Sequence, residues 1–292
     1  MKSSIQNALT AALLRTLSIL PYKLVGRTGE ALGSLLYRIP GKRRAILRTN
    51  LRLCFPEKTP VQREALAMAT FRHVIRSYLE RGVQWYGSAA ALADLMEVES
   101  AIELQDSYDQ PTIFLGFHFA AIEAGCMYYS TRHPVASIYT PMSDAATDGI
   151  SLRQRGRFGT EMIPRNKSAR EVLKVLKSGK PIMLAADMDF GLRDSVFVPF
   201  FGVQACTLTS VSRLAKLSGA RVVPFVTEVL PGYQGYKLSI FEPLQNFPSG
   251  DVTLDALHMN EFLEKQVRRF PEQYYWVHRR FKRRPAGESS VY

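Results

Sequence analysis

Cysteine is scarce in this chain, which has three among its 292 residues: Cys54, Cys126 and Cys206. They are odd in number and far apart, so they provide neither a disulfide framework nor paired metal ligands. A reducing compartment is the simplest interpretation. An acyl-cysteine intermediate at Cys126 is conceivable, but its apolar surroundings favour a buried packing role.

Several catalytic signatures are also missing. The sequence has no Gly-x-Ser-x-Gly elbow, phosphate-binding loop or dinucleotide fingerprint. Covalent serine catalysis, nucleotide hydrolysis and hydride transfer therefore lack their expected parts. There is no His-Glu-x-x-His motif either, and one His with one Glu does not make a zinc ligand set. We predict no metal and no cofactor.

Near the N-terminus there is no clean apolar run of about 18 residues, the length that a membrane-spanning helix needs. The apolar stretch 9–25 is interrupted by Arg15, Pro21 and Lys23. It is not a persuasive secretory signal, because its basic region is a single lysine and no small-residue cleavage site follows. We predict two helices, 5–20 and 24–37, that lie in a membrane interface; an ordinary amphipathic hairpin is the alternative.

Negative charge is in deficit. Thirty-eight Lys and Arg against 26 Asp and Glu give a net charge of +12, which favours an anionic partner. No zinc-finger spacing or RNA-recognition signature accompanies the charge, so nucleic acid is the weakest candidate. The densest basic run, 279–285, follows Tyr274, Tyr275 and Trp276 and suits anionic headgroups or a phosphorylated glycolipid. A merely solubilising basic tail is the alternative.

Helical and strand patterns alternate through the rest of the chain. A long helix is expected at 60–85. Strands are expected at 112–117, 136–139, 161–163, 181–186, 196–200, 222–227 and 236–241. Helices are expected at 121–129, 144–158, 169–177, 207–217 and 251–270. Because such crossovers are what parallel strands require, the predicted fold class is α/β: a mixed, largely parallel sheet flanked by helices. We expect a membrane-associating helical segment at 1–40 and the α/β domain, with its basic C-terminal segment, at 41–292.

The strongest chemical signal is TIFLGFHFAAIEAG, which places His118 five residues before Glu123. Five helical residues rotate a side chain by roughly 500°, so the two groups could not meet if both sat mid-helix. His118 should therefore precede a helix that begins near residue 121, with Glu123 in its first turn. The pair suggests a general base and the carboxylate that orients it, with a substrate hydroxyl as nucleophile. A core histidine near a helix-capping Glu is the alternative for the pair taken alone.

Other polar residues are candidates for binding substrate. Arg153 and Arg157 are four residues apart on an expected helix, and they could bind phosphate or the thioester end of a donor. A solvated basic helix is the alternative, above all for Arg155. Asp187 and Asp189 follow an apolar strand, at the sheet edge where open α/β folds place their ligands. They could anchor Arg157 or support the acceptor, or merely begin a loop.

Six segments together are far more specific than the His/Glu pair. They are RRAILRTNLRLCFPE (43–57), GFHFAAIEAG (116–125), RQRGRFGTEMIPR (153–165), AADMDFGLRDSVFVPFFG (185–202), SRLAKLSGARVVPF (212–225) and PEQYYWVHRRFKRRP (271–285). In them the chain closely resembles the late acyltransferases of lipid A biosynthesis, within the His-x4-Asp/Glu acyltransferase superfamily. Glycerol-phosphate acyltransferases usually have Asp where this chain has Glu123, followed by a Phe-Pro-Glu-Gly block that is missing here. The glycolipid branch is therefore favoured.

The resemblance implies an O-acyltransferase that moves a fatty acyl chain from acyl carrier protein to a hydroxyl of a lipid A precursor. It places the enzyme on the cytoplasmic face of the bacterial inner membrane, held peripherally or by a single N-terminal anchor. Its expected partners are acyl carrier protein, an anionic membrane surface and a phosphorylated glycolipid, with no nucleic acid. The implied catalytic residues are His118 and Glu123, and the implied substrate-binding residues are Arg157, Asp187, Arg153, Arg165 and Asp189.

Two alternatives stay open. One is the same mechanism on another acceptor, such as a lysophospholipid or an ornithine-type lipid. The other is a membrane-surface binding protein without catalysis, against which the presence of both His118 and Glu123 argues.

Overall fold

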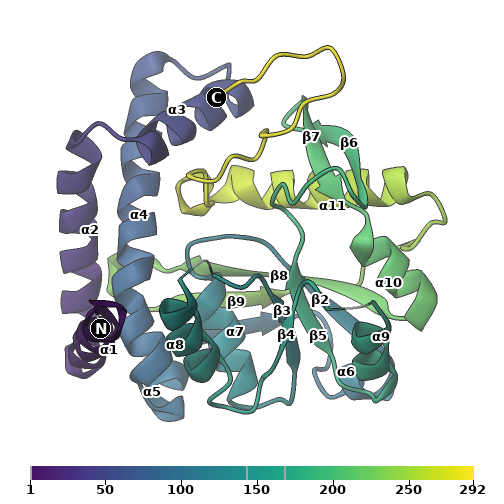
Figure 1. Cartoon of the computed structure of the whole chain (residues 1–292), viewed down its shortest axis with the longest axis horizontal. Helices are drawn as coiled ribbons and strands as arrows, with labels where there is room; N and C mark the ends of the chain where they lie inside the picture. Colours follow the sequence, from purple (N-terminus) through teal and green to yellow (C-terminus); the bar gives the residue numbers. More distant parts are fainter. Residues whose placement is uncertain (1, 143, 168) are drawn as a thin grey trace.

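Helices make up the N-terminal third of the chain (Figure 1). The computed structural model describes residues 2–142, 144–167 and 169–292; Met1, the first residue of the expected 1–40 segment, lies outside the described residues, as do Ser143 and Ser168. The N-terminal helices are α1 (Lys2–Ile19), α2 (Tyr22–Arg38), α3 (Lys42–Cys54), α4 (Pro60–Tyr86) and α5 (Ala89–Asp94). The predicted helices 5–20, 24–37 and 60–85 are confirmed, whereas α3 and α5 were not predicted.

α4 begins at a complete capping box. The Thr59 hydroxyl accepts a hydrogen bond from the Gln62 amide, and the Gln62 side chain accepts one from the Thr59 amide. Glycines let the neighbouring helices approach α4 closely. A Cβ on Gly29 of α2 would lie 2.6 Å from the Arg76 Cα, and one on Gly82 would lie 2.5 Å from the Leu17 Cβ of α1. Both α1 and α2 therefore pack closely against α4.

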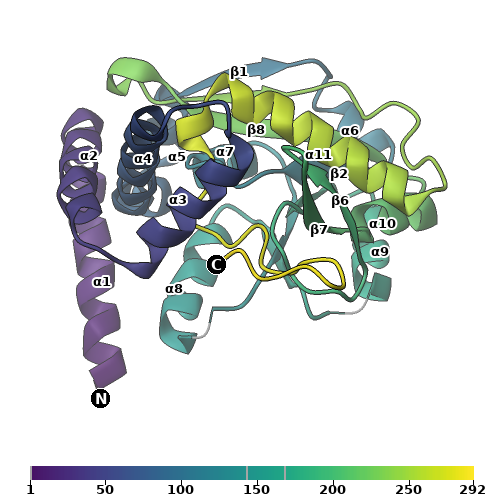
Figure 2. The same ribbon diagram turned by 90° about the horizontal axis from the view of Figure 1, so that it is seen from above.

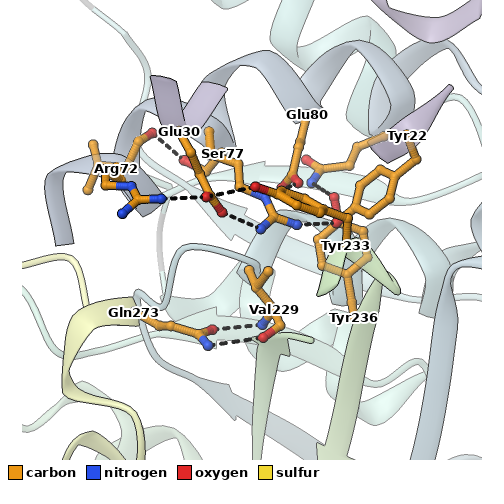
Figure 3. Close-up of polar contacts among 12 residues, drawn as sticks. Tyr22, Glu30, Arg72, Ser77, Glu80, Val229, Tyr233, Tyr236 and Gln273 are labelled. Atoms are coloured by element: carbon orange, nitrogen blue, oxygen red, sulfur yellow. Dashed lines mark hydrogen bonds and ion pairs between the residues drawn. The ribbon is translucent and has the colours of Figure 1, made fainter. Parts of the chain in front are cut away.

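A polar cluster joins these helices to the sheet (Figure 3). Glu30 of α2 accepts a hydrogen bond from Arg76 at 2.9 Å. It accepts another, at 3.0 Å, from the hydroxyl of Tyr233, which lies in the turn between β8 (Arg221–Val229) and β9 (Tyr236–Ile240). Arg76, which is 3% exposed, also donates to Glu80 at 2.6 Å and to the Tyr22 hydroxyl at 2.8 Å. Because a buried arginine needs several acceptors, this cluster fixes α2 and α4 against the β8–β9 turn.

The large apolar side chains of α1 and α2 divide into two groups. Leu14 and Leu17 pack into a core cluster with Trp85, and they are 7% and 8% exposed. Others point outward, with exposed fractions between 37% and 82%: Leu9, Leu13, Ile19, Leu24, Leu32 and Leu35. Figure 2 shows α1 leaving the bundle on the side of α8, with the N-terminus at its far end. No helix in the described part of the chain is long and apolar enough to cross a membrane.

Behind the helices lies a seven-stranded sheet of order β1-β9-β8-β2-β5-β3-β4. Its strands are β1 (Met96–Ser100), β2 (Thr112–Gly116), β3 (Ala136–Tyr139), β4 (Glu161–Pro164), β5 (Ile182–Ala185), β8 (Arg221–Val229) and β9 (Tyr236–Ile240). Among the described strands of this sheet, only the β8–β9 pair is antiparallel. The predicted mixed, largely parallel sheet is confirmed.

Helices cover both faces of this sheet, as the prediction required. They are α6 (Asp106–Asp109), α7 (Ile122–Ser130), α8 (Ala145–Arg155), α9 (Ala169–Lys177), α10 (Ser210–Ser218) and α11 (Val252–Arg269), with single 3₁₀ turns at Pro231–Tyr233 and Pro271–Gln273. β2 is buried along its whole length: Ile113 and Leu115 pack in the cluster with α11, and Phe114 packs on α7. A central strand with two buried faces is apolar throughout, which is why its pattern was clear in the sequence.

Two strands differ from the prediction. β1 was missed because its side chains are mostly exposed and polar. β7 (Val203–Leu208) was assigned in part to a helix at 207–217, but it forms an antiparallel hairpin with β6 (Ser195–Phe200), and the helix begins at Ser210. Val198, Phe200 and Phe201 of the hairpin are buried in the main core. The division of the chain at residue 40 stays a prediction.

Candidate active site

His118 and Asp187 meet at the carboxyl edge of the central strands. β2 and β5 are parallel neighbours in which Gly116 pairs with Ala185, so the same register extended by two residues sets His118 beside Asp187. His118 Nδ1 lies 2.6 Å from Asp187 Oδ1, and the His118 amide donates to Asp187 Oδ2 at 3.0 Å. One carboxylate therefore fixes both the ring and the backbone of the histidine.

The turn that carries His118 is held from the opposite side by the C-terminal segment. The Tyr275 amide donates to the His118 carbonyl at 2.9 Å, and the Ala120 amide donates to the Gln273 carbonyl at 2.8 Å. Between these bonds the Phe119 ring packs edge-on against Tyr274, with centroids 5.6 Å apart. The turn is thus bonded on both flanks, and the position of His118 is set by distant parts of the chain.

The charge of Asp187 determines how the imidazole is protonated. Burial would raise the pKa of this carboxyl, but the charge of His118 and the hydrogen bonds from its ring and amide outweigh burial and lower it to about 2. An ionised carboxylate can only accept, so in the neutral ring Nδ1 carries the hydrogen and Nε2 is an acceptor. The His118 side chain is 29% exposed and that of Asp187 is 1% exposed. The ring is therefore accessible, and no hydrogen bond of Nε2 is recorded among the described residues.

Glu123 lies in the first turn of α7, as predicted, but it does not hold His118. Arg155 binds both of its oxygens, Nε to Oε1 at 2.8 Å and Nη2 to Oε2 at 2.6 Å. The indole N–H of Trp85 donates to Oε1 at 2.8 Å. The prediction that Glu123 orients His118 is thus wrong in its geometry, because α7 turns this carboxylate toward α4 and α8 while Asp187 takes the ring nitrogen.

The Glu123–Arg155 pair is largely buried and charged. Burial would raise the pKa of Glu123, but Arg155, and to a smaller extent Arg81 and the Trp85 N–H, lower it to about 2. Sequence reasoning did not select Arg155 as a site residue, because a solvated basic helix explained it nearly as well. Its helix gave no apolar signal, because the buried residue one turn earlier, on the same face as Arg155, is Ser151. Trp85 was missed as well, since its N–H donor is marked by nothing in the sequence.

The two α8-region arginines that were predicted to share a helical face do not share one. α8 ends at Arg155, so Arg157 lies beyond it, and its Nη2 donates to the Gln84 carbonyl at 3.2 Å and to the Gly87 carbonyl. Arg157 therefore holds the end of α4, where cations suit the free helix carbonyls. Arg153 is exposed on α8. Nη2 of Arg157 thus makes a structural contact, and the substrate-binding role predicted for Arg157 stays a prediction.

The last two predicted binding residues have different surroundings. Asp189 accepts from the Arg283 guanidinium at 2.5 Å and from the Arg283 amide at 2.8 Å, so it fixes a loop. Arg165 follows β4 at the same sheet edge as His118 and stacks on Phe190, 4.0 Å from the ring centroid. Asp189 is buried, whereas Arg165 is exposed.

The basic C-terminal run is partly built into the fold. Arg280 is 2% exposed and donates to the Cys206 carbonyl at 2.8 Å and to the Thr207 hydroxyl at 2.9 Å. Arg283 pairs with Asp189, and Arg284 pairs with Glu288. These three cations hold the chain together, contrary to the expectation that the whole run faces anionic headgroups.

The remaining chemical alternatives concern thiols and metals. Burial, followed by the nearby charge of Glu123, raises the pKa of Cys126 to about 12, which keeps it a protonated and poorly nucleophilic thiol. Within residues 2–142, 144–167 and 169–292, no group of three His, Cys, Asp or Glu side chains is placed to hold a metal ion.

A carboxylate-held histidine at the C-terminal edge of a largely parallel sheet is the arrangement that enzymes use for general base catalysis on a hydroxyl or similar nucleophile. Sequence comparison gives the particular family. Residues 2–283 match the family of the bacterial lipid A biosynthesis acyltransferases, and the chain belongs to that family. It is therefore an acyltransferase of lipid A biosynthesis.

Individual relatives agree with this assignment. The lipid A biosynthesis lauroyltransferase of Escherichia coli (strain K12) is 36% identical over 276 residues, covering 94% of this chain and 90% of that protein. The palmitoleoyltransferase of the same strain is 33% identical with the same coverage, and its myristoyltransferase is 27% identical, covering 92% of this chain and 81% of that protein. These relatives transfer three different acyl chains, so the family match does not specify which chain this enzyme transfers.

Proposed function

We propose that this enzyme transfers a fatty acyl group from an acyl-carrier-protein thioester to a hydroxyl of a lipid A precursor. The observation that carries the proposal is the double contact of Asp187 with His118, which leaves Nε2 as the accepting nitrogen of an accessible ring. No side-chain nucleophile is needed in this scheme, because the acceptor hydroxyl attacks the thioester directly.

His118 would act first as base and then as acid. Nε2 takes the proton of the acceptor hydroxyl while its oxygen forms a bond to the thioester carbonyl carbon, which gives a tetrahedral oxyanion. Asp187 stabilises the imidazolium that results. When the intermediate collapses, the carbon–sulfur bond breaks and the departing thiolate takes the proton from His118. The products are the ester and the free thiol of the carrier.

Glu123 keeps its proposed place in the machinery, but through Arg155. The carboxylate occupies Nε and Nη2 of Arg155, and Nη1 has no hydrogen bond recorded among the described residues. We propose that Glu123 fixes the guanidinium so that Nη1 donates to the thioester oxyanion. Glu123 would then be a positioning residue, and Arg155 the group that touches the reacting atoms.

An acidic carrier protein is a suitable donor for this surface. The net charge of +12 favours rapid, salt-sensitive association with an acidic protein. A lysophospholipid or an ornithine-type lipid as acceptor would use the same His118–Asp187 chemistry, so acceptor identity has to be measured.

The deciding experiment measures acyl transfer by mass spectrometry from a panel of acyl-carrier-protein thioesters to a tetra-acylated lipid A precursor. We expect product with the wild type, none with His118→Ala and a sharp reduction with Glu123→Ala. Transfer only to a lysophospholipid or an ornithine lipid would overturn the acceptor assignment and keep the mechanism. Full activity of His118→Ala would overturn the mechanism.

We propose further that the outer face of α1 and α2 lies in the cytoplasmic interface of the bacterial inner membrane. Leu9, Leu13 and Ile19 are 66%, 60% and 82% exposed, and Arg15 and Lys23 stand near them for anionic headgroups. Flotation with anionic phospholipid vesicles tests this. The double variant Leu9→Ser, Leu13→Ser should lose most vesicle binding, whereas Leu217→Ser, which changes a 61% exposed leucine on α10, should not. Equal binding by both would contradict the proposal.

A further inference from the structure

Arg81 lies on the face of α4 that borders the active site. Tyr78, Arg81 and Trp85 are spaced three and four residues apart, so they share one side of the helix. The Arg81 guanidinium carbon lies 4.6 Å from the Tyr78 ring centroid and 5.4 Å from that of Trp85. Two aromatic rings therefore hold the cation in place before any ligand arrives, which lowers the entropic cost of using it for binding.

Both rings are connected to the catalytic residues. Trp85 donates to Glu123, and the Tyr78 hydroxyl lies 2.7 Å from the hydroxyl of Tyr275. The Tyr275 amide in turn donates to the His118 carbonyl. Arg81 thus stands between the elements that carry Glu123 and His118, and its charge contributes to lowering the pKa of Glu123.

No protein acceptor is recorded for the five N–H donors of Arg81 among the residues that the structure describes, although the side chain is half-buried. The neighbouring carboxylates are already taken, since Arg155 and Trp85 bind Glu123, and His118 binds Asp187. Arg76, on another face of the same helix, has Glu30 and Glu80 as partners. A cation that is fixed but lacks an acceptor points to an anion supplied by a ligand.

A second cation, Arg43, lies on the same side of the active site. Arg43 of α3 uses Nη1 to bind the Val277 carbonyl at 3.0 Å, and the residue is otherwise exposed. Val277 follows Tyr275 by two residues, and the Tyr275 hydroxyl meets that of Tyr78, the ring on which the Arg81 guanidinium lies. Two guanidinium groups around one site are a suitable pair for the several oxygens of a phosphate.

We propose that Arg81, with Arg43 beside it, binds a phosphate group of the substrate next to His118. This assignment rests on the proposed acyl transfer and adds a subsite to it. It places a phosphate site apart from Arg157, which uses Nη2 to bind the end of α4. Phosphate reaches an acyl-transfer site from two sources: the phosphorylated glycolipid acceptor, and the phosphopantetheine arm of the donor.

Steady-state kinetics with Arg81→Gln, Arg81→Lys and Arg43→Gln test the subsite. The matched control is Arg52→Gln, which removes an exposed arginine of α3. For Arg81→Gln we expect the KM of the phosphate-bearing substrate to rise about ten- to a hundredfold, with kcat changed less than about threefold. Arg43→Gln should give a smaller rise, and Arg81→Lys should lie between the wild type and Arg81→Gln.

Phosphate-free substrates identify the source. If the acceptor phosphate is bound, Arg81→Gln and wild type should use a dephosphorylated acceptor equally well. If the donor phosphate is bound, the two should be equal with an acyl-pantetheine donor that lacks phosphate. Unchanged KM values for both substrates in Arg81→Gln would overturn the proposal. A decrease in kcat alone would also overturn it, because Arg81 would then act on the transition state.

Binding measurements separate this proposal from the proposed function. His118→Ala, which cannot turn over in our scheme, is titrated calorimetrically in detergent with the phosphorylated glycolipid, its dephosphorylated form and acyl-phosphopantetheine. If the subsite exists, His118→Ala should bind the phosphorylated ligand more tightly than its dephosphorylated form, and adding Arg81→Gln should remove that difference. This result does not depend on whether the wild type transfers acyl groups in the kinetic assay. Equal affinities of His118→Ala and the His118→Ala, Arg81→Gln variant for the phosphorylated ligands would overturn the subsite proposal.

Discussion

Asp187 contacts His118 twice, through the ring nitrogen Nδ1 at 2.6 Å and through the backbone amide at 3.0 Å. The contact follows from the parallel register of β2 and β5, which sets residue 118 opposite residue 187 just beyond the strand ends. A side chain that bonds both ring and amide fixes the direction of the imidazole as well as its tautomer. The histidine is thus oriented by a strand far away in the sequence.

Asp187→Asn should therefore reduce kcat far more than KM. The amide can keep the size of the side chain, but it removes the negative charge that stabilises the imidazolium and permits the wrong tautomer. We expect a decrease in kcat of about 10²- to 10⁴-fold. Asp94→Asn, which changes an exposed carboxylate at the end of α5, should leave kcat unaltered. A kcat within threefold of wild type in Asp187→Asn would show that Asp187 is dispensable.

The sequence revealed both partners of this contact but not the contact. Strands ending near residues 117 and 186 were predicted, and Asp187 was identified as a polar residue at a strand end. What local patterns cannot supply is the strand order, because pairing between residues 69 positions apart depends on the whole sheet. Glu123, the carboxylate nearest to His118 in the sequence, was therefore predicted to orient it. In the structure Asp187 does so.

The Glu123–Arg155 pair should matter for stability as well as for activity. Their side chains are 14% and 25% exposed, so Glu123→Gln leaves a largely buried cation without its counter-charge. We expect a loss of about 3 kcal/mol in the free energy of unfolding, measured with urea. Trp85→Phe removes the N–H donor together with part of a buried ring, so it should cost about 2–3 kcal/mol.

A double-mutant cycle isolates the pair. Arg155→Met alone should destabilise the protein, because it leaves Glu123 buried and unpaired. Adding Glu123→Gln to Arg155→Met should recover part of that loss, since neither charge is then present. Additive losses in the double variant would show that the two side chains do not interact energetically.

Two partly buried histidines should make the protein less stable in mild acid. Burial, aided by Arg76, lowers the pKa of His73 to about 4, and burial, aided by His118, lowers that of His278 to about 4. Below about pH 6.5 the unfolded chain binds these protons and the native protein does not, so stability falls with pH until about pH 4. The slope is about 1.4 kcal/mol per pH unit for each histidine at most.

Urea unfolding at pH 7, 6 and 5 measures this slope. His73→Gln should reduce it by about half, because one of the two main groups is gone. His133, whose pKa is also lowered by burial, is more exposed and should contribute less. Asp187 and Glu123, with pKa values of about 2, lose their contribution only below about pH 4 and do not affect this window. An unchanged slope in His73→Gln would contradict the assignment.

Contacts between helices were as hard to predict as strand order. Helix 60–85 was clear from its pattern, but nothing in it showed which side faces α1, α2 or the site. Gly29 and Gly82 settle part of that arrangement, since their missing side chains make room for neighbouring helices. A glycine inside a helical pattern ordinarily indicates a less stable helix, and here it indicates that another helix packs closely against it.

Gly82 and Gly149 should therefore respond in opposite ways to alanine. Both lie inside helices, where alanine is intrinsically better than glycine by about 1 kcal/mol. A Cβ on Gly149 meets nothing within 4 Å, so Gly149→Ala should raise the free energy of unfolding by about 0.5–1 kcal/mol.

On Gly82 the same atom would lie 2.5 Å from the Leu17 Cβ and 2.7 Å from the Leu14 carbonyl, so α1 has to move away from α4. The overpacking cost of about 1–3 kcal/mol should exceed the helical gain, so Gly82→Ala should lower stability. Because Leu14 and Leu17 pack in one cluster with Trp85, its fluorescence should change in Gly82→Ala and not in Gly149→Ala. Stabilisation by both substitutions would mean that α1 does not pack on α4 as described.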